Sequence, residues 1–475
     1  MPSANDSPRI GLLGIMQELY DDDLPGITER QGQYAQRIAD QLSEEVEVEF
    51  PGPARNRSDI EERVRGFNHA AGGDGLDGIL IVMLTYGPAM RTVRALEEND
   101  LPVMLANVQP QRTVTKDWDM ADLTYNQGVH GAQDMANTLM RLGIDCPIIS
   151  DDWRSDRFRA FVSDWAHAAQ ARQSLRSMRL AQFGQMPGMG DIATDEGVFM
   201  RELGPQIDRV SLGPIKQRME AVSDAAVEAA MAEDEEHFEI DDVLAEGGDK
   251  REAHAYAARF EVAIEDFLDE EGYDGFSIYF GAVGDDGRFE QLHMLAASNL
   301  MAKGYGYAAE GDMGGATLIT AGQHLAPDPH FTEMYAMDFE RDAILQSHMG
   351  EGNWKIARSD RPVRLIDREL GIGGLDNPPT VLFQGEPGPA TLTSLVSLPG
   401  GDYRLVAATG EILDTEELPH VEMPYFHFRP ESGVRKCLDG WLEAGGTHHQ
   451  CLHLGDRSRR WERFCELAGV EYVSV

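Results

Sequence analysis

Basic residues are scarce in this 475-residue chain, and lysine is the scarcest of them. The chain carries 41 Lys and Arg against 82 Asp and Glu, a formal net charge of −41, and only six of the basic residues are lysines. A surface of this sign repels phosphate backbones and anionic lipids, which argues against nucleic acid or a membrane as a partner. Spread acidity with so little lysine is typical of a halophilic protein, because the screening length falls to about 3 Å in molar salt. An ordinary acidic protein is the alternative.

The chain also lacks a cysteine framework and a long apolar run. Its four cysteines form no C-x-x-C pair, which indicates reduced thiols and argues against a small secreted disulfide scaffold. The longest apolar run, residues 78–84, is far shorter than the roughly 20 residues that span a bilayer. The first residues lack the basic start of a signal peptide. We therefore expect a soluble, cytoplasmic protein.

Strand and helix patterns alternate through the first 150 residues. The expected strands are residues 9–16, 46–50, 78–84 and 102–106, and the expected helices between and after them are residues 27–42, 60–71, 89–99 and 128–142. This alternation predicts a parallel sheet with helices on both faces. Such sheets bind ligands beyond the carboxyl ends of their strands, which points to residues 17–20 and 85–88.

The pattern changes in the remainder of the chain. The expected elements of the middle part are helices at 156–179, 217–236 and 252–271, a polar linker at 239–249 and a strand at 275–280. From about residue 360, short strands alternate with Gly and Pro turns, which predicts an antiparallel β domain.

Carboxylates and imidazoles that could hold a metal ion occur in two stretches. Glu310, Glu333 and His348 lie in the first, and His448 and His449 follow a Gly-rich turn in the second. Two carboxylates with two imidazoles suit Mn²⁺ or a similar divalent ion better than a thiolate-rich zinc site. A lone Glu among 82 acidic residues is usually solvated, however, and a lone His is usually packed. Without a short fixed spacing, these residues alone indicate no more than a candidate divalent-metal enzyme.

Several motifs, in the same order, resemble the L-arabinose isomerase family. The motifs that carry the resemblance are GYGYAAEGD at 304–312, LGIGGLD at 370–376, GPA at 388–390, AGGTHH at 444–449, GIMQELY at 14–20 and NQGVHG at 126–131. Their order agrees with the family along nearly the whole chain.

The resemblance implies a fucose isomerase-like architecture and an aldose–ketose isomerase. The expected fold is α/β, with two doubly wound parallel-sheet domains at residues 1–180 and 181–330 and a β-rich C-terminal domain at 331–475. The implied substrate is a monosaccharide, converted from L-arabinose to L-ribulose, and the implied cofactor is Mn²⁺ or another divalent cation. The implied assembly is a homotrimer or homohexamer with sites between subunits.

The resemblance also assigns the site residues. The metal ligands would be Glu310, Glu333, His348 and His449, and the substrate contacts would be Gln17, Leu19, Phe280, Tyr335, Ile372 and His448, with His130 reaching a neighbouring subunit's site. The implied reaction passes through an enediolate that a divalent cation stabilises. Glu310 and Glu333 would serve as its acid/base pair, and Asp312 would support the ligands from behind.

Two alternatives stay open. Leu84 stands where typical members carry a histidine, so the same chemistry on L-fucose, D-arabinose or D-galactose also fits. A non-catalytic sugar-binding protein could share the α/β pattern, but it would not need two carboxylates beside a metal.

Overall fold

The computed structural model describes residues 7–69, 75–371 and 374–475, which divide into two compact units. Described residues up to 173 form the N-terminal unit, and residues from 174 onward form the C-terminal unit. No described helix is both long enough and apolar enough to cross a membrane. Ile372, one of the expected substrate contacts, lies outside the described residues.

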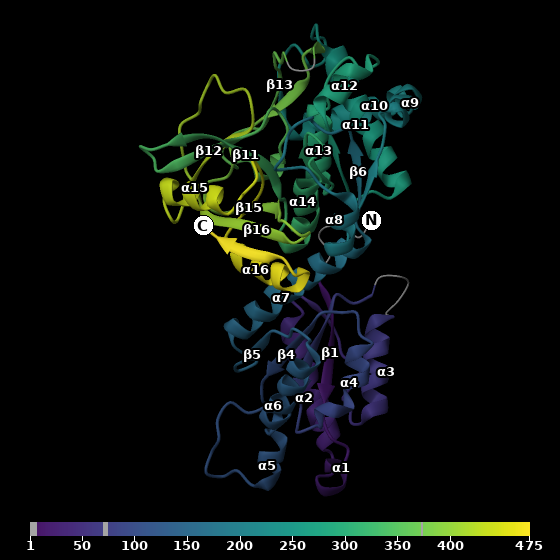
Figure 1. The fold of residues 1–475 in the computed structure, drawn as a ribbon, viewed down its shortest axis with the longest axis vertical. Coiled ribbons are helices and arrows are strands. Elements are labelled where there is room, and N and C mark those ends of the chain that lie inside the picture. Colours follow the sequence, from purple (N-terminus) through teal and green to yellow (C-terminus); the bar gives the residue numbers. More distant parts are fainter. Residues whose placement is uncertain (1–6, 70–74, 372–373) are drawn as a thin grey trace. The chain divides into compact units, whose positions relative to one another are not determined.

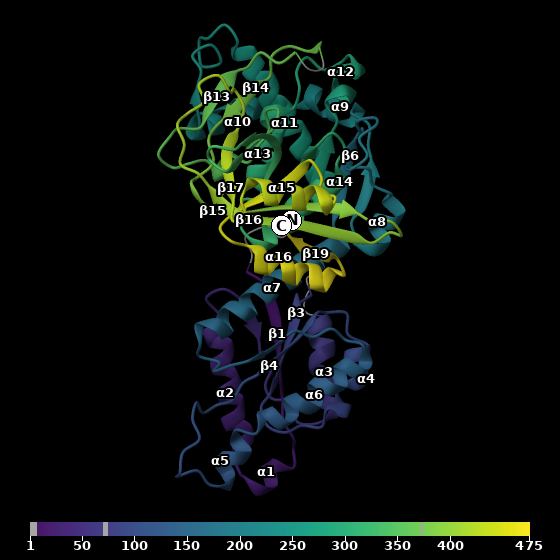
Figure 2. The ribbon, with the colours of Figure 1, turned by 60° about the vertical axis from the view of Figure 1, so that its left-hand side comes forward.

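A five-stranded parallel sheet forms the centre of the N-terminal unit. Its strands, in spatial order, are β2 (Glu47–Glu49), β1 (Arg9–Ile15), β3 (Gly78–Met83), β4 (Val103–Asn107) and β5 (Ile148–Ser150). Every residue of β3 is buried, as expected for a central strand that is covered on both faces. Helix α2 (Ile27–Leu42) lies on one side of the strands and α3 (Arg57–Asn68) on the other (Figures 1 and 2). The doubly wound architecture expected for this part is confirmed.

The helix expected over residues 89–99 is interrupted. The structure has a 3₁₀ turn at Ala89–Arg91 and then a short helix α4 (Val93–Glu97). The Thr92 amide and hydroxyl both donate to the Ala89 carbonyl, at 2.9 and 2.7 Å, which tightens the chain into an i to i+3 turn. The prediction of one continuous helix over these residues is therefore wrong.

The C-terminal unit begins with a second parallel sheet. Its strands, in spatial order, are β10 (Gly306–Ala309), β9 (Gly275–Ile278), β6 (Arg179–Phe183) and β7 (Gln206–Arg209). Helix α14 (Met313–Leu325) crosses it closely, because a Cβ on Gly306 would lie 1.8 Å from Thr320 Oγ1. Glycine at this position lets the helix approach the strand.

The helix expected over residues 217–236 is also wrong, because two helices occupy this region. Helix α9 (Gly213–Ala221) ends before Val222, and α10 (Asp224–His237) begins after Ser223. The Ser223 side chain accepts a hydrogen bond from the Ala226 amide at 3.2 Å, which caps the new helix. Further on, the strand expected at 275–280 ends at Ile278, and Phe280 begins helix α12 (Phe280–Asp286).

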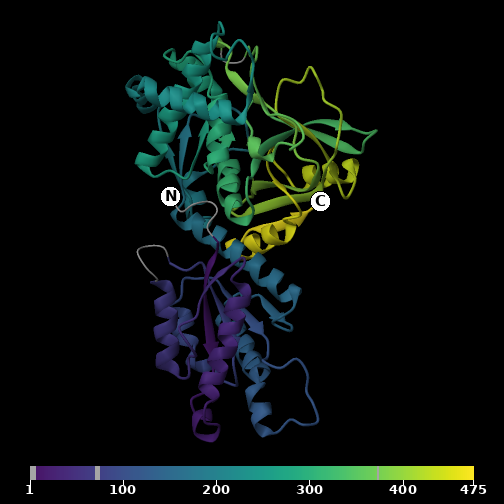
Figure 3. The same ribbon diagram turned by 180° about the vertical axis from the view of Figure 1, so that it is seen from behind.

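The last part of the chain is rich in β structure, as expected. The strands of its large sheet, in spatial order, are β15 (Gly388–Ser397), β18 (His449–Leu454), β11 (His330–Asp338), β12 (Ala343–Ser347), β17 (Tyr425–Pro430), β16 (Tyr403–Ile412) and β19 (Glu471–Ser474). Because β15 also pairs with β16, the first six strands close into a barrel. Helix α16 (Ser458–Ala468) lies against β16 and β19, and the green and yellow strands curve around one another in Figure 3.

A small three-stranded sheet lies beside this barrel. It consists of β14 (Pro379–Leu382), β13 (Arg364–Asp367) and β8 (Glu239–Ile240). Strand β8 comes from the start of the expected linker at 239–249 and pairs in parallel with β13. The start of the expected linker therefore forms a strand of this sheet.

Candidate metal centre

Strand register brings three of the expected metal ligands together. Glu333 on β11 is paired with His449 on β18 and, on its other side, with Ser347 on β12. His348 follows Ser347 directly. In an antiparallel pair, the Cβ atoms of two residues directly opposite one another lie about 4.5–5.5 Å apart. The pairing of three strands thus joins residues that are far apart in the sequence.

Glu310 reaches the same place from the end of the parallel sheet. It follows β10 with a φ of 65°, a left-handed conformation that costs a non-glycine residue about 1–3 kcal/mol. Its amide donates to the Ile278 carbonyl at 3.1 Å, and its carbonyl accepts from the Met186 amide at 2.9 Å. These hydrogen bonds hold the strained turn that directs Glu310 toward the barrel strands.

The expected ligands face one another across a few ångströms. His449 Nε2 lies 3.4 Å from Glu333 Oε1 and 3.6 Å from Glu310 Oε2, and His348 Nε2 lies 3.9 Å from Glu333 Oε2. Two triads result, Glu333–His348–His449 and Glu310–His448–His449, and within each triad the ligand atoms lie within 4.8 Å of one another. His449 belongs to both triads and stands at the centre.

Two buried atoms at this centre, His449 Nε2 and Glu310 Oε2, have no hydrogen-bond partner among the residues that the structure describes. A buried polar atom left unpaired costs about 1–3 kcal/mol, and here the two unpaired atoms face each other. One divalent cation would satisfy both. Because imidazole nitrogen and carboxylate oxygen are accepted ligands of such ions, the residues present fit a divalent cation.

Carboxylates hold the far side of the two buried imidazoles. His449 Nδ1 lies 3.0 Å from Asp312 Oδ2, and His348 Nδ1 lies 2.7 Å from Glu351 Oε2. Such contacts fix the orientation of a ligand ring and direct its other nitrogen toward the metal. Asp312 lies in the supporting position that the resemblance implied. Glu351 was not foreseen, and the three-residue spacing from His348 was its only signal.

Glu351 is itself held by a buried chain of hydrogen bonds. Its Oε1 lies 2.7 Å from the Tyr307 hydroxyl, which lies 3.0 Å from His293 Nε2. A carboxylate can only accept, so Tyr307 donates to Glu351 and accepts from His293. All three side chains are buried, which fixes the carboxylate behind His348.

Burial and neighbouring carboxylates have opposite effects on the pKa values of the buried histidines. Burial lowers the pKa of His449, but Asp312 and Glu333 outweigh it and raise the pKa to about 10. Burial likewise opposes charge on His348, whose pKa Glu351 nevertheless raises. Against the effect of burial, His348 lowers the pKa of Glu351 to about 2. The neighbouring carboxylates therefore favour positive charge at both imidazoles, and a bound divalent cation would supply that charge.

His448 occupies the more exposed side of the centre, with 36% of its side chain exposed. Its Nε2 lies 3.7 Å from Glu333 Oε1 and 3.8 Å from Glu310 Oε2, and the Glu310 carboxylate raises its pKa. The Nδ1 of His448 lies 2.6 Å from Asp191 Oδ2. The same oxygen accepts a hydrogen bond from the His448 backbone amide at 3.0 Å. Asp191 was not foreseen, because it lies in an irregular loop after β6 with no motif around it.

A cavity of about 140 Å³ adjoins the centre. Glu310 and His348 lie on its wall with Phe280, and the side chains of Ile278, Met294 and Met349 make much of the lining apolar. Phe280 therefore lies beside the metal centre. Burial, and after it the charge of the nearby Glu333 carboxylate, raises the pKa of the Tyr335 phenol.

Apart from Ile372, the remaining expected contacts lie in the N-terminal unit. Gln17 and Leu19 follow β1 at the carboxyl edge of its sheet, where Leu19 is 47% exposed. His130 lies on helix α6 (Gly128–Leu142) and is exposed. Their part in a sugar site stays a prediction.

Comparison with known proteins accounts for nearly the whole chain. Models of the L-arabinose isomerase N-terminal, central and C-terminal domains match residues 9–177, 179–328 and 328–471. L-arabinose isomerase 1 of Bacillus licheniformis is 30% identical over 420 residues, which cover 86% of this chain and 82% of that protein. The L-arabinose isomerases of Aeromonas salmonicida and Clavibacter sepedonicus are each 27% identical; the first alignment covers 93% of this chain and 89% of the relative, and the second 99% and 93%. The chain belongs to the L-arabinose isomerase family and is an aldose–ketose isomerase.

Proposed function

We propose that this enzyme interconverts L-arabinose and L-ribulose with Mn²⁺ held by Glu310, Glu333, His348 and His449. The observation that carries the proposal is the meeting of two carboxylates with two buried imidazoles, at a centre where His449 Nε2 and Glu310 Oε2 have no hydrogen-bond partner within the described part of the chain. Aldose–ketose isomerisation moves a proton between adjacent carbons, so it needs basic groups within reach of both. Two carboxylates on separate elements meet that need.

When bound, the cation supplies Lewis-acid stabilisation of the charge that develops on the sugar oxygens. Glu310 and Glu333 carry the protons: one takes the proton from C2, and the other serves C1 and the hydroxyl groups. Their separate origins, the strained turn after β10 and strand β11, let them approach the sugar from different sides. His348 and His449 keep fixed orientations because Glu351 and Asp312 hold their far nitrogens.

The sugar would lie partly in the 140 Å³ cavity beside the metal centre. Its apolar wall, which includes Phe280, would exclude water and contact the carbon skeleton. Tyr335 and His448 would contact the sugar hydroxyls at the open side. We also assign Gln17, Leu19 and Ile372 to the substrate, and His130 to the site of a neighbouring subunit in a homotrimer or homohexamer acting in the cytoplasm.

A second candidate is the same reaction on another aldose, such as L-fucose, D-arabinose or D-galactose. The observation in its favour is Leu84, which is fully buried at the carboxyl end of β3. An apolar side chain there offers a sugar no hydrogen bond at a position where typical members carry a histidine.

A sugar panel tests both candidates. The full chain, stripped with a chelator and reloaded with Mn²⁺, is offered each aldose, and the ketose is measured. We expect L-arabinose to react fastest, and Glu310→Gln and Glu333→Gln to lower turnover by about 10²–10⁴. Glu62→Gln, which alters a carboxylate that is 72% exposed on α3, is the matched control and should leave turnover unchanged. Faster turnover of another aldose would contradict the L-arabinose assignment, and no turnover of any sugar would contradict catalysis.

A further inference from the structure

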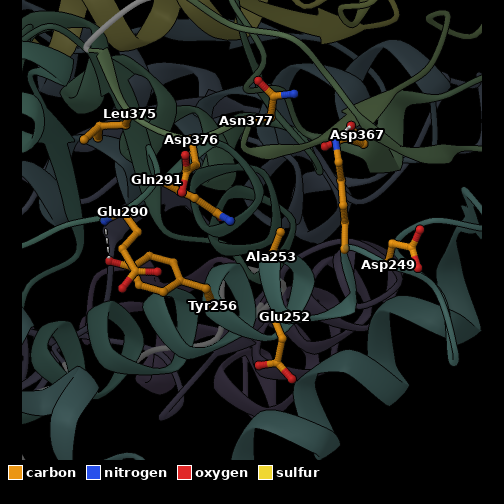
Figure 4. A pocket seen from close by; sticks show the side chains of 11 residues that line it. Asp249, Glu252, Ala253, Tyr256, Glu290, Gln291, Asp367, Leu375, Asp376 and Asn377 are labelled. Carbon is orange, nitrogen blue, oxygen red and sulfur yellow. Dashed lines mark hydrogen bonds and ion pairs between the residues drawn. The ribbon is translucent and has the colours of Figure 1, made fainter.

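Carboxylates are common on this chain, and pairing with an imidazole distinguishes the few that act at the site. A cavity of about 490 Å³ in the C-terminal unit is lined by five carboxylates and one lysine (Figure 4), but its described lining residues include no histidine. At the metal centre, the Nδ1 atoms of three histidines each lie beside a carboxylate. Two of these pairs support the proposed metal ligands His348 and His449. The third joins His448 to Asp191, and neither the sequence motifs nor the metal accounts for it.

Asp191 holds both the backbone and the ring of His448 with one oxygen atom. Its Oδ2 accepts a hydrogen bond from the His448 amide at 3.0 Å and lies 2.6 Å from His448 Nδ1. Since an ionised carboxylate can only accept, Nδ1 carries the proton of this contact. His448 immediately precedes β18, in which the pairing with β11 begins at His449 opposite Glu333. Asp191 therefore fixes a residue that lies just outside the strand pairing.

The loop that carries Asp191, residues 184–192, also holds the turn that carries Glu310. Within this loop, the Met186 amide donates to the Glu310 carbonyl at 2.9 Å. At the end of the loop, Ile192 is only 3% exposed, so its burial anchors the chain directly beside Asp191. One loop thus fixes both a proposed acid/base carboxylate and the imidazole next to it.

The ring that Asp191 fixes faces both proposed acid/base carboxylates. His448 Nε2 lies 3.7 Å from Glu333 Oε1 and 3.8 Å from Glu310 Oε2, which is longer than an ordinary hydrogen bond. A sugar hydroxyl beside Nε2 would therefore also lie close to one of these carboxylates. The His448 side chain is 36% exposed, whereas that of His449 is fully buried. The ring is thus open to a sugar on a side where the metal ligand is not.

We propose that Asp191 is a positioning residue for the sugar and acts through His448. The inference rests on the proposed function, in which His448 contacts the sugar hydroxyls. Because Asp191 already holds Nδ1 and the amide, the ring does not have to be ordered when the sugar binds, and less binding free energy is lost. The metal ligands have carboxylate partners of their own, so Asp191 acts on sugar affinity and not on Mn²⁺ affinity.

Asp191→Ala separates these two affinities. We expect the KM for L-arabinose to rise about tenfold while kcat stays within about threefold of the wild type, because binding and not the chemical step is lost. L-arabitol has the hydroxyl groups but no carbonyl group to isomerise. Its affinity, measured by calorimetric titration of the full, Mn²⁺-loaded chain, should fall by the same factor. Competition with a chromophoric chelator should show Mn²⁺ affinity within about twofold of the wild type. Asp191→Asn keeps one acceptor oxygen and should recover part of the lost sugar affinity.

Asp195→Asn is the matched control, since it makes the same exchange slightly further along the chain. The Asp195 side chain accepts from the Val198 amide at 3.0 Å and caps helix α8 (Glu196–Glu202). Asparagine caps a helix as well as aspartate does, so both affinities should stay unchanged. In a His448→Ala background, Asp191→Ala should cause no further loss of L-arabitol affinity, because the residue through which it acts is absent.

Unchanged KM and L-arabitol affinity in Asp191→Ala would overturn the proposal, and so would an equal loss in the His448→Ala background. Weaker Mn²⁺ binding in Asp191→Ala would mean that Asp191 acts through the ion, which also overturns it. Because Asp191 is exposed, the substitution removes no core packing. If the wild type converts another aldose faster, the L-arabinose assignment fails, whereas a higher KM for that aldose in Asp191→Ala still supports the positioning role.

Discussion

Glu351 offers the most specific perturbation of the metal centre that leaves its ligands intact. The side chain is 3% exposed, its Oε2 lies 2.7 Å from His348 Nδ1, and its Oε1 accepts from Tyr307. Glu351→Gln keeps the size of the side chain but removes its charge and one acceptor oxygen. Either His348 or Tyr307 must then face an amide NH₂ group, so the ring of His348 loses its fixed orientation or its charged partner.

The expected effect is a weaker affinity for Mn²⁺. Removing the partner of a metal-ligating histidine typically lowers metal affinity 10- to 100-fold. That range corresponds to about 1.4–2.8 kcal/mol of binding free energy. The contact is buried and charge-assisted, which places the expected loss toward the upper end. Competition with a chromophoric chelator measures the affinity directly and does not depend on turnover.

Glu261→Gln is the matched control, because it makes the same exchange at another buried glutamate, 2% exposed, on helix α11. Its Mn²⁺ affinity should equal that of the wild type. If Glu351→Gln folds normally and binds Mn²⁺ within about twofold of the wild type, Glu351 does not hold His348 in the orientation that metal binding requires. Equal losses in both variants would point to general destabilisation.

Four further predictions concern the rest of the molecule. Asp312→Asn should weaken Mn²⁺ binding about 10- to 100-fold through His449, measured by the same competition; unchanged affinity would contradict its supporting role. Gly306→Ala should lower the free energy of unfolding by about 1–3 kcal/mol in urea, because the new Cβ meets Thr320, whereas Gly66→Ala, with open space around the added Cβ, should not destabilise α3. Burial raises the pKa of Asp77 from 3.8 to about 6, so the folded state binds this proton more tightly than the unfolded chain. Its stabilising contribution is present below pH 4 and lost as the pH rises to 6; urea titrations should show this slope and show it absent in Asp77→Asn. The acidic, lysine-poor composition predicts that unfolding temperature rises with KCl concentration, and full stability and assembly in low salt would contradict a halophilic protein.

The N-terminal parallel sheet was predictable because its signals are local. Strands β1, β3 and β4 are short apolar runs buried on both faces. Helices α2 and α6 carry their buried residues at helical spacing along one face. The errors arose where one side chain redirects the backbone. The Thr92 hydroxyl tightens a turn in one expected helix, and the Ser223 cap divides another.

The metal centre shows why local patterns identify residue types better than they identify sites. Glu333 and His449 meet only because β11 and β18 pair in one register, and Glu310 joins them through a strained turn of another sheet. Without the family resemblance, Glu310 and Glu333 were two of 82 acidic residues. Glu351 and Asp191 were missed for the same reason. A facing imidazole distinguishes both residues and burial distinguishes Glu351, and neither property can be read from the spacing of residues.

Mn²⁺-dependent isomerisation is tested by measuring L-ribulose formation from L-arabinose while Mn²⁺ is added back to the chelator-stripped enzyme. We expect negligible turnover without the ion, and a rise that saturates at one Mn²⁺ per chain. A His449→Ala variant, which lacks the residue shared by both ligand triads, should not saturate in this way. Full turnover by the stripped enzyme, or the same Mn²⁺ dependence in His449→Ala, would contradict Mn²⁺-dependent catalysis at this centre.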